Sequence, residues 1–178
     1  FPADLSASIC SANLCACRKG VKEMIECQDV SFSYPASTLP DSERQAGGAL
    51  KHISCTIEDG SFVLLCGTSG CGKTTMTRLF NGLIPHYHEG TYTGSVYLDG
   101  KDTRDLSLFD ISLKVGSVFQ NPRSQFFNVD TTSELAFGPE NHGIAEDLVR
   151  DRVKRVAAQL KLEPLLDRSI FSLSGGEK

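Results

Sequence analysis

The sequence lacks three features that would each indicate a particular class of protein. It has no excess of basic residues, and its net charge of −4 gives no electrostatic reason to expect nucleic-acid binding. No apolar run approaches the roughly 18 residues that span a bilayer, so any membrane association is expected to come through a partner. No basic segment followed by an apolar stretch lies near the start, which argues against a secretory signal.

The cysteines also lack the spacing of a disulfide framework. There are seven, an odd number, and three of them lie together near the start without a second C-x-x-C pair or a nearby His to complete a zinc site: Cys10, Cys15 and Cys17. We therefore expect reduced thiols, with Cys55 and Cys66 in the core. Cys71 is the exception, because its place in a glycine-rich loop should leave it open to alkylation.

The length and composition are those of one soluble globular domain: 178 residues, of which 40% are hydrophobic and 22% charged. The chain begins at Phe1 rather than Met and stops at Lys178, so both ends are expected to be the edges of a fragment.

The most informative stretch is residues 67–75, Gly-Thr-Ser-Gly-Cys-Gly-Lys-Thr-Thr. It matches the phosphate-binding pattern G-x-x-x-x-G-K-[ST] at every fixed position. Residues 61–66 form a short apolar run that predicts a buried strand, and residues 74–83 carry apolar side chains at helical spacing. Strand, loop and helix follow in the order of a nucleoside triphosphate site. The alternative is a glycine-rich turn that binds nothing.

The residue types in this loop explain how it would hold ATP. Gly67, Gly70 and Gly72 allow tight turns, so that successive N–H groups form an anion nest at a helix N-terminus. Lys73 is expected to reach the β- and γ-phosphates, and the Thr74 hydroxyl is expected to bind Mg²⁺. The remaining loop residues are expected to contact the nucleotide as well: Thr68, Ser69, Cys71 and Thr75.

Alternating or short apolar runs predict four further strands. Residues 26–34 and 49–57 alternate, and the second segment is expected to form a hairpin with residues 61–66 across Asp59-Gly60. Residues 94–98 and 115–119 are the other two. A small antiparallel patch is therefore expected beside the nucleotide core.

Helices are predicted to dominate the last third of the chain. Thr131 and Glu134 have the spacing of a capping box that opens a short helix ending near Gly138-Pro139. Residues 146–161 show the apolar periodicity of an amphipathic helix. The sequence thus predicts an α/β nucleotide core followed by a helical subdomain.

Later motifs resemble those of the ATP-binding-cassette (ABC) ATPases. Residues 173–177, Leu-Ser-Gly-Gly-Glu, resemble the signature of this family, and Gln120, which lies 47 residues after Lys73, resembles its Q-loop glutamine. Tyr34 matches the aromatic residue that stacks on adenine in this family. The alternatives are a half-buried strand tyrosine at position 34 and a solvated loop glutamine at position 120.

The resemblance is sharpest to the ABC ATPases of the energy-coupling-factor (ECF) type, which power uptake of vitamins and of cobalt or nickel. Residues 115–122, 125–127 and 134–141 carry it, with Phe-Gly-Pro-Glu-Asn at 137–141 the most specific string. It covers residues 24–178 and leaves residues 1–23 unassigned. It implies a P-loop NTPase (RecA-like) core with its β patch at residues 24–120 and a helical subdomain at residues 121–178.

The resemblance also implies roles and partners. Ser174, Gly175 and Gly176 would open a helix whose N-terminus binds the γ-phosphate held by a second ABC subunit, so that ATP joins two identical or different subunits head to tail. Gln120 would contact Mg²⁺ or the attacking water, as a catalytic residue beside Lys73. Its loop would also transmit the closure of the dimer around ATP to a transmembrane subunit. The motor would lie at the cytoplasmic face of the membrane, with no nucleic-acid partner.

One departure from the family pattern is at the C-terminal end. In the family, the signature is followed by a strand (Walker B) whose Asp holds Mg²⁺ and whose Glu polarises water, and then by a switch His. The chain stops before these motifs, so the C-terminal part of the core is expected to be missing. This polypeptide is therefore not expected to turn over ATP unaided.

Three other functions remain open. A soluble ABC ATPase of translation or DNA repair would generally carry two cassettes in one chain. A P-loop kinase or GTPase would require the signature and Gln120 to be coincidences. A catalytically dead nucleotide-binding remnant would follow if the chain truly ends at Lys178.

Overall fold

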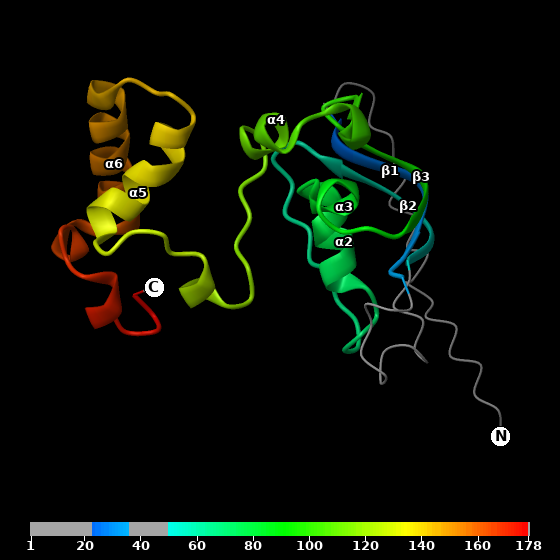
Figure 1. The fold of residues 1–178 in the computed structure, drawn as a ribbon, viewed down its shortest axis with the longest axis horizontal. Helices are drawn as coiled ribbons and strands as arrows, with labels where there is room; N and C mark the ends of the chain where they lie inside the picture. The colour runs from blue at the N-terminus through cyan, green and yellow to red at the C-terminus, as the bar shows by residue number, and fades with distance from the viewer. Residues whose placement is uncertain (1–22, 36–49, 178) are drawn as a thin grey trace. The chain divides into compact units, whose positions relative to one another are not determined.

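The computed structural model describes residues 23–35 and 50–177 of the chain. It divides into two compact units, Phe1–Gly116 and Ser117–Lys178. The described strands and the predicted phosphate loop belong to the first unit, and the two longest helices belong to the second (Figure 1). The cysteines at positions 10, 15 and 17 lie outside the described residues.

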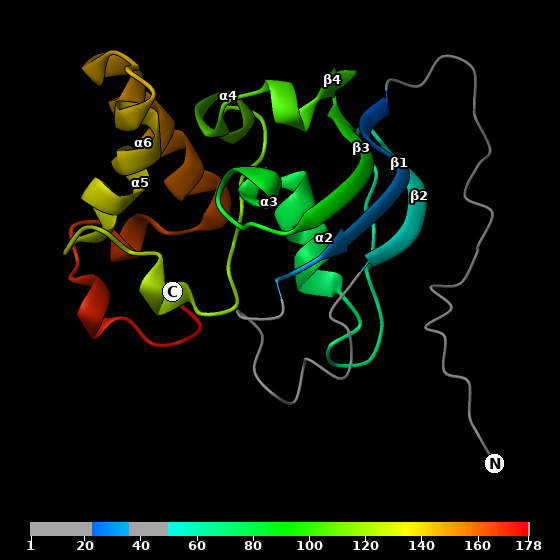
Figure 2. The ribbon, with the colours of Figure 1, turned by 45° about the vertical axis from the view of Figure 1, so that its right-hand side comes forward.

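The first unit is built on an antiparallel sheet in the order β2-β1-β3-β4 (Figure 2). Its strands are β1 Glu23–Ser33, β2 Leu50–Glu58, β3 Thr91–Leu98 and the short β4 Lys101–Asp102. β3 turns into β4 through Asp99 and Gly100, both with positive φ, which is the backbone that a tight hairpin favours. The predicted antiparallel patch is confirmed, and β3 begins earlier than the predicted strand at residues 94–98.

Helices α2 Lys73–Phe80 and α3 Leu83–His86 lie on one face of this sheet (Figure 2). Val30 and Phe32 of β1 are buried in one core cluster with Met76 and Leu79 of α2. Burial of each such side chain contributes about 1.5–3 kcal/mol. The core therefore fixes α2, and with it the end of the phosphate loop, against the central strand.

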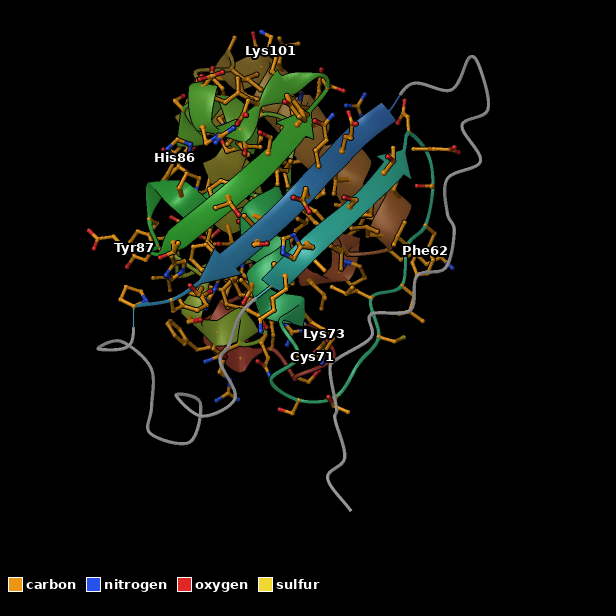
Figure 3. The ribbon with its side chains drawn as sticks, turned by 90° about the vertical axis from the view of Figure 1, so that its right-hand side faces the viewer. Phe62, Cys71, Lys73, His86, Tyr87 and Lys101 are labelled. Carbon is orange, nitrogen blue, oxygen red and sulfur yellow. The ribbon has the colours of Figure 1, made fainter. Side chains whose placement is uncertain are left out.

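The predicted buried strand at residues 61–66 is wrong. Residues 61–68 form neither helix nor strand, and Phe62 is 92% exposed and points away from the sheet (Figure 3). β2 pairs with β1 instead of forming the predicted hairpin across Asp59-Gly60. A buried strand needs neighbours for its backbone hydrogen bonds, and no described strand pairs with this segment.

The predicted strand at residues 115–119 is wrong for the same reason. These residues lie outside every described strand, and Val118 and Phe119 are exposed. Cys66 is exposed as well, against the expectation that it belongs to the core, whereas Cys55 is half-buried.

The second unit contains helices α5 Thr131–Asn141 and α6 Glu146–Leu160. The predicted capping box at Thr131 is wrong, because Asp130 is the N-cap and its side chain accepts a hydrogen bond from Ser133 N. Glu134 instead accepts from Phe127 N and Asn128 N, and α5 continues past Gly138-Pro139. The amphipathic helix is confirmed; its buried residues are Val149, Val153 and Ala157, while Leu160 is exposed.

The remaining elements are short. They are η1 Thr103–Asp105, α4 Leu108–Ser112, η2 Pro122–Ser124, η3 Glu163–Leu165 and η4 Ile170–Ser172. Across residues 23–35 and 50–177, none of the helices combines the length and the apolar character needed to cross a membrane.

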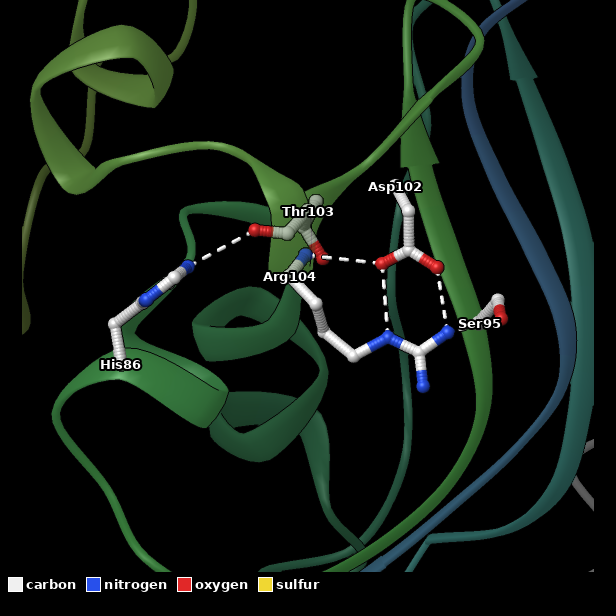
Figure 4. A network of polar contacts seen from close by, with 5 residues as sticks. All are labelled: His86, Ser95, Asp102, Thr103 and Arg104. Carbon is white, nitrogen blue, oxygen red and sulfur yellow. Dashed lines mark hydrogen bonds and ion pairs between the residues drawn. The ribbon is translucent and has the colours of Figure 1, made fainter.

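A polar network holds the turn after β4 (Figure 4). Arg104 donates hydrogen bonds to both carboxylate oxygens of Asp102 and to Ser95 Oγ, and its guanidinium carbon lies 5.5 Å from the centre of the Tyr92 ring. His86 Nε2 lies 2.9 Å from the carbonyl oxygen of Thr103. The hydrogen bond from Arg104 holds the pKa of Asp102 below its usual value.

Replacing Asp102 with Asn should lower stability at neutral pH by about 1 kcal/mol or less, since Arg104 remains partly in water. The folded pKa of Asp102 is depressed, so the stability from this pair is present above the unfolded pKa of about 3.9 and is lost as pH falls through the folded value. Thermal unfolding should therefore show a Tm difference from the parent at pH 7 that shrinks at pH 3. Asp105→Asn serves as the control, and a difference that persists unchanged at pH 3 would contradict this account.

Candidate functional site

Two glycines of the loop before α2 have backbone conformations that other residues rarely adopt. Gly70 and Gly72 have φ values of 79° and 94°, in the left-handed region that glycine adopts without strain. A Cβ at position 72 would lie 2.7 Å from Leu50 Cδ2 of β2. α2 begins at Lys73, immediately after Gly72. The end of the loop is therefore fixed both to the helix and to the sheet.

The side chain of Lys73 contacts this loop, and Lys73 lies close to Cys71 (Figure 3). Its Nζ donates hydrogen bonds to the carbonyl oxygens of Gly67, at 2.9 Å, and of Thr68, at 2.7 Å. The same atom lies 3.6 Å from Cys71 Sγ. A Cβ at position 67 would lie 2.5 Å from that sulfur, so the glycine also leaves room for the Cys71 side chain. The ammonium charge is thus held within the loop.

The first turn of α2 fits an anion. Its leading N–H groups have no partner inside the helix, and the N-cap Gly72 has no side chain to cap them. These donors and the positive end of the helix dipole favour a phosphate group. Thr74 is exposed whereas Thr75 is buried, so Thr74 offers the accessible hydroxyl for a magnesium ion. The chemistry of these groups fits MgATP.

Tyr34, the predicted adenine-stacking residue, follows β1 and is held by several neighbours. Its ring lies edge-on to Phe32, with centroids 4.8 Å apart, and to His88, at 6.1 Å. Its hydroxyl accepts a hydrogen bond of 2.8 Å from Arg78 Nη1 of α2. Tyr34 remains only half-buried, which leaves part of its surface accessible. The sequence analysis missed Arg78, whose only sequence signal is its place in the predicted helix at residues 74–83, five residues after Lys73.

Gln120 lies in the second unit, in an exposed segment outside the described helices and strands. Gln125 braces the residues just before it: Oε1 accepts from Phe119 N at 2.7 Å, and Nε2 donates to the carbonyl oxygen of Ser117 at 3.0 Å. Backbone groups two residues apart face the same side of an extended segment. The side-chain amide of Gln125 therefore makes the two hydrogen bonds that a neighbouring strand would otherwise make to Ser117 and Phe119. Sequence analysis placed Gln125 in a resembling string but gave it no role.

Ser174, Gly175 and Gly176 lie in a turn near the end of the described residues. Glu177 Oε2 accepts a hydrogen bond of 2.8 Å from Ser174 N. Hydrogen bonding to the side chain of Ser174, and then to its backbone N–H, holds the pKa of Glu177 below its usual value. A glutamate reaching back to an N–H three residues earlier is one half of a capping box. The helix expected here stays a prediction, since Lys178 lies outside the described residues.

The predicted site residues are thus divided between the two units. The phosphate loop and Tyr34 belong to the first, where Arg78 connects Tyr34 to the helix that carries Lys73. Gln120 and the turn at Ser174 belong to the second. In the part of the chain that the structure describes, no group of three or more His, Cys, Asp or Glu side chains could hold a metal ion by itself.

The sequence matches the family described as "ABC transporter" over residues 50–178. A protein of Treponema denticola named "Putative ABC transporter ATP-binding protein" is 46% identical over 155 residues, which cover 87% of this chain and 30% of that protein. Proteins of the same name from Methanosarcina mazei and Streptococcus mutans are 42% and 40% identical, over 87% and 89% of this chain and 25% and 27% of their own lengths. The chain therefore spans less than a third of the length of these relatives. Its family match and its phosphate loop together show that the chain belongs to the ABC transporter family, within the ATP-binding domain.

Proposed function

We propose that this chain is the nucleotide-binding part of an ATP-driven transport motor of the ECF type. The observation that carries the proposal is the position of Lys73 over the carbonyls of Gly67 and Thr68, at an uncapped helix N-terminus. Family membership supports ATP as the nucleotide. The ECF class rests on the resemblance of residues 115–122 and 137–141, and it would make the cargo a vitamin or a transition-metal ion.

In this proposal the loop exchanges internal contacts for contacts with phosphate. Lys73 leaves two neutral carbonyl acceptors for oxygens of the β- and γ-phosphates, so that its ammonium gains the opposite charge of the phosphates in addition to the hydrogen bonds. The N–H groups that follow Gly72 bind the same phosphates, and Thr74 binds Mg²⁺. Tyr34 stacks on the adenine, with Arg78 fixing the orientation of its ring through the hydroxyl.

The second unit supplies the residues that respond to the γ-phosphate. Gln120 contacts Mg²⁺ or the attacking water, and its segment transmits closure to a transmembrane subunit. Ser174, Gly175 and Gly176 bind the γ-phosphate held by the opposite subunit of a head-to-tail dimer. ATP hydrolysis, the membrane partner and a peripheral position at the cytoplasmic face are proposed for the full-length protein, because the relatives are more than three times as long as the matched region.

Lys73→Ala should weaken ATP binding by about 100-fold, because two charge-assisted hydrogen bonds to phosphate are lost at roughly 1.5 kcal/mol or more each. Lys101→Ala, at the exposed first residue of the short strand β4, is the matched control and should bind as the parent does. Titration with a fluorescent ATP analogue measures both. Unchanged affinity in Lys73→Ala would overturn the assignment of the phosphate loop.

Gln125→Leu should lower kcat for ATP hydrolysis by about tenfold in the full-length protein and leave KM for ATP nearly unchanged, because it frees the segment before Gln120 without touching the phosphate loop. Gln125→Glu keeps the acceptor for Phe119 N but loses the donor to Ser117, so its kcat should be intermediate. If Gln125→Leu raises KM as much as it lowers kcat, the substitution does not act through the Gln120 segment, and the role of Gln125 in holding that segment is wrong.

Ser174→Arg should leave ATP binding to a single subunit intact but block the ATP-dependent dimer, because the larger side chain fills the space expected for the partner's γ-phosphate. Gln159→Arg, on the exposed face of α6, adds the same side chain elsewhere in the second unit and should still dimerise. Light scattering of the full-length protein with a non-hydrolysable ATP analogue distinguishes them. A dimer that forms normally with Ser174→Arg would refute the role of this turn.

A further inference from the structure

Two cysteines face each other across the first two strands of the sheet. In the antiparallel register of β1 and β2, Cys27 pairs directly with Cys55. Directly opposed residues in such a ladder have Cα atoms about 4.5–5.5 Å apart, inside the range of about 4.4–6.8 Å that a disulfide spans. Both side chains lie on the face of the sheet that packs against α2, where Cys27 is a core residue and Cys55 packs against the core. The backbone therefore already has a spacing that a disulfide accepts.

The two thiols also interact. A hydrogen bond between the two side chains raises the pKa of Cys27, as does its burial, and lowers the pKa of Cys55. Cys27 is 3% exposed, whereas Cys55 is half-buried on β2, which lies at one edge of the sheet formed by the described strands. A reagent from solution therefore reaches Cys55 first, and Cys27 lies behind it within the core.

We propose that Cys27 and Cys55 form a reversible redox-modification site, at which a low-molecular-weight disulfide such as oxidised glutathione converts the two thiols into one cross-strand disulfide. The site is separate from the phosphate loop at residues 67–75, and the inference does not rest on the proposed function.

The reaction proceeds in two exchanges. The thiolate of Cys55 attacks one sulfur of oxidised glutathione, forming a mixed disulfide on Cys55 and releasing one glutathione thiolate. Cys27 then gives up its proton, and its sulfur attacks the Cys55 sulfur of the mixed disulfide, releasing the second glutathione thiolate. The two protein thiols lose two electrons and two protons in total, and one glutathione disulfide becomes two molecules of reduced glutathione.

The linked peptide can be identified directly. The folded chain is incubated with oxidised glutathione, quenched with N-ethylmaleimide in denaturant, and digested with trypsin and a glutamate-specific protease. Cleavage after Glu26, Glu43, Lys51 and Glu58 places Cys27 in residues 27–43 and Cys55 in residues 52–58, apart from Cys66 and Cys71. Mass spectrometry should find these two peptides joined, and the joined species should disappear on reduction.

Exposed Cys66 provides an internal measure of oxidation in the same sample. If Cys66 is fully modified by glutathione while Cys27 and Cys55 are both recovered as maleimide adducts, the proposal is overturned. The proposal is supported if the joined peptide forms and the oxidised chain still shows a thermal unfolding transition, because the disulfide has then formed in the folded chain.

Two variants test the order of the exchanges. Cys27→Ala removes the second thiol without adding a polar group to the core, so glutathione should remain attached to Cys55. In Cys55→Ala, Cys27 has lost its outer partner, and its modification should fall at least tenfold relative to Cys66. A folded Cys27→Ala chain with no glutathione on Cys55, or a Cys27 that reacts undiminished in Cys55→Ala, would contradict the proposal.

Discussion

The packing of α2 against the antiparallel sheet is the constraint on which the nucleotide site depends. α2 has eight residues, and isolated helices shorter than about 12–15 residues are marginal in water. Its stability therefore comes from the core that Met76 and Leu79 form with β1. The same packing brings Leu50 of β2 against Gly72, at the point where the loop becomes helix. Without the sheet, neither the helix N-terminus nor the loop before it would have a fixed geometry.

This arrangement leaves unpaired charge and unpaired donors at one place. Lys73 bonds only carbonyl oxygens and lies near one sulfur among the described residues, and the N-cap of α2 has no side chain to satisfy the first turn. A bound phosphate supplies the missing negative charge and acceptors. Tyr34 is hydrogen-bonded to the same helix through Arg78, so the proposed contacts to the phosphates and to the base would share one support. Binding energy at the phosphate can thus be gained without reorganising the support.

Sequence patterns predicted those features of the structure that depend on residues close together in the sequence. The glycines of the phosphate-loop pattern predicted tight turns, and Gly70 and Gly72 do have positive φ values; alternating or periodic apolar residues predicted β1, β2 and α6. The strand predictions at residues 61–66 and 115–119 were wrong. An apolar run indicates that a segment tends to be buried, but it does not indicate which strand the segment pairs with. The N-cap of α5 was misplaced by one residue because Asp130 and Thr131 can both cap, and the side chain of Glu134 bonds elsewhere.

Contacts between residues far apart in the sequence could not be predicted from sequence patterns. Arg78 and Gln125 are ordinary polar residues until the fold brings them to Tyr34 and to the backbone before Gln120. The pairing of Cys27 with Cys55 depends on the register between β1 and β2, and this register shifts at three places along β1, one of them directly after Cys27.

The central claim is that residues 67–75 bind the phosphates of ATP through their backbone. Hydrogen exchange of the loop amides, measured with MgATP and with adenosine, tests it most directly. The account predicts slower exchange at residues 72–75 with MgATP and no change with adenosine, because the phosphates supply the acceptors. Loop amides that exchange equally fast with and without saturating MgATP would contradict it.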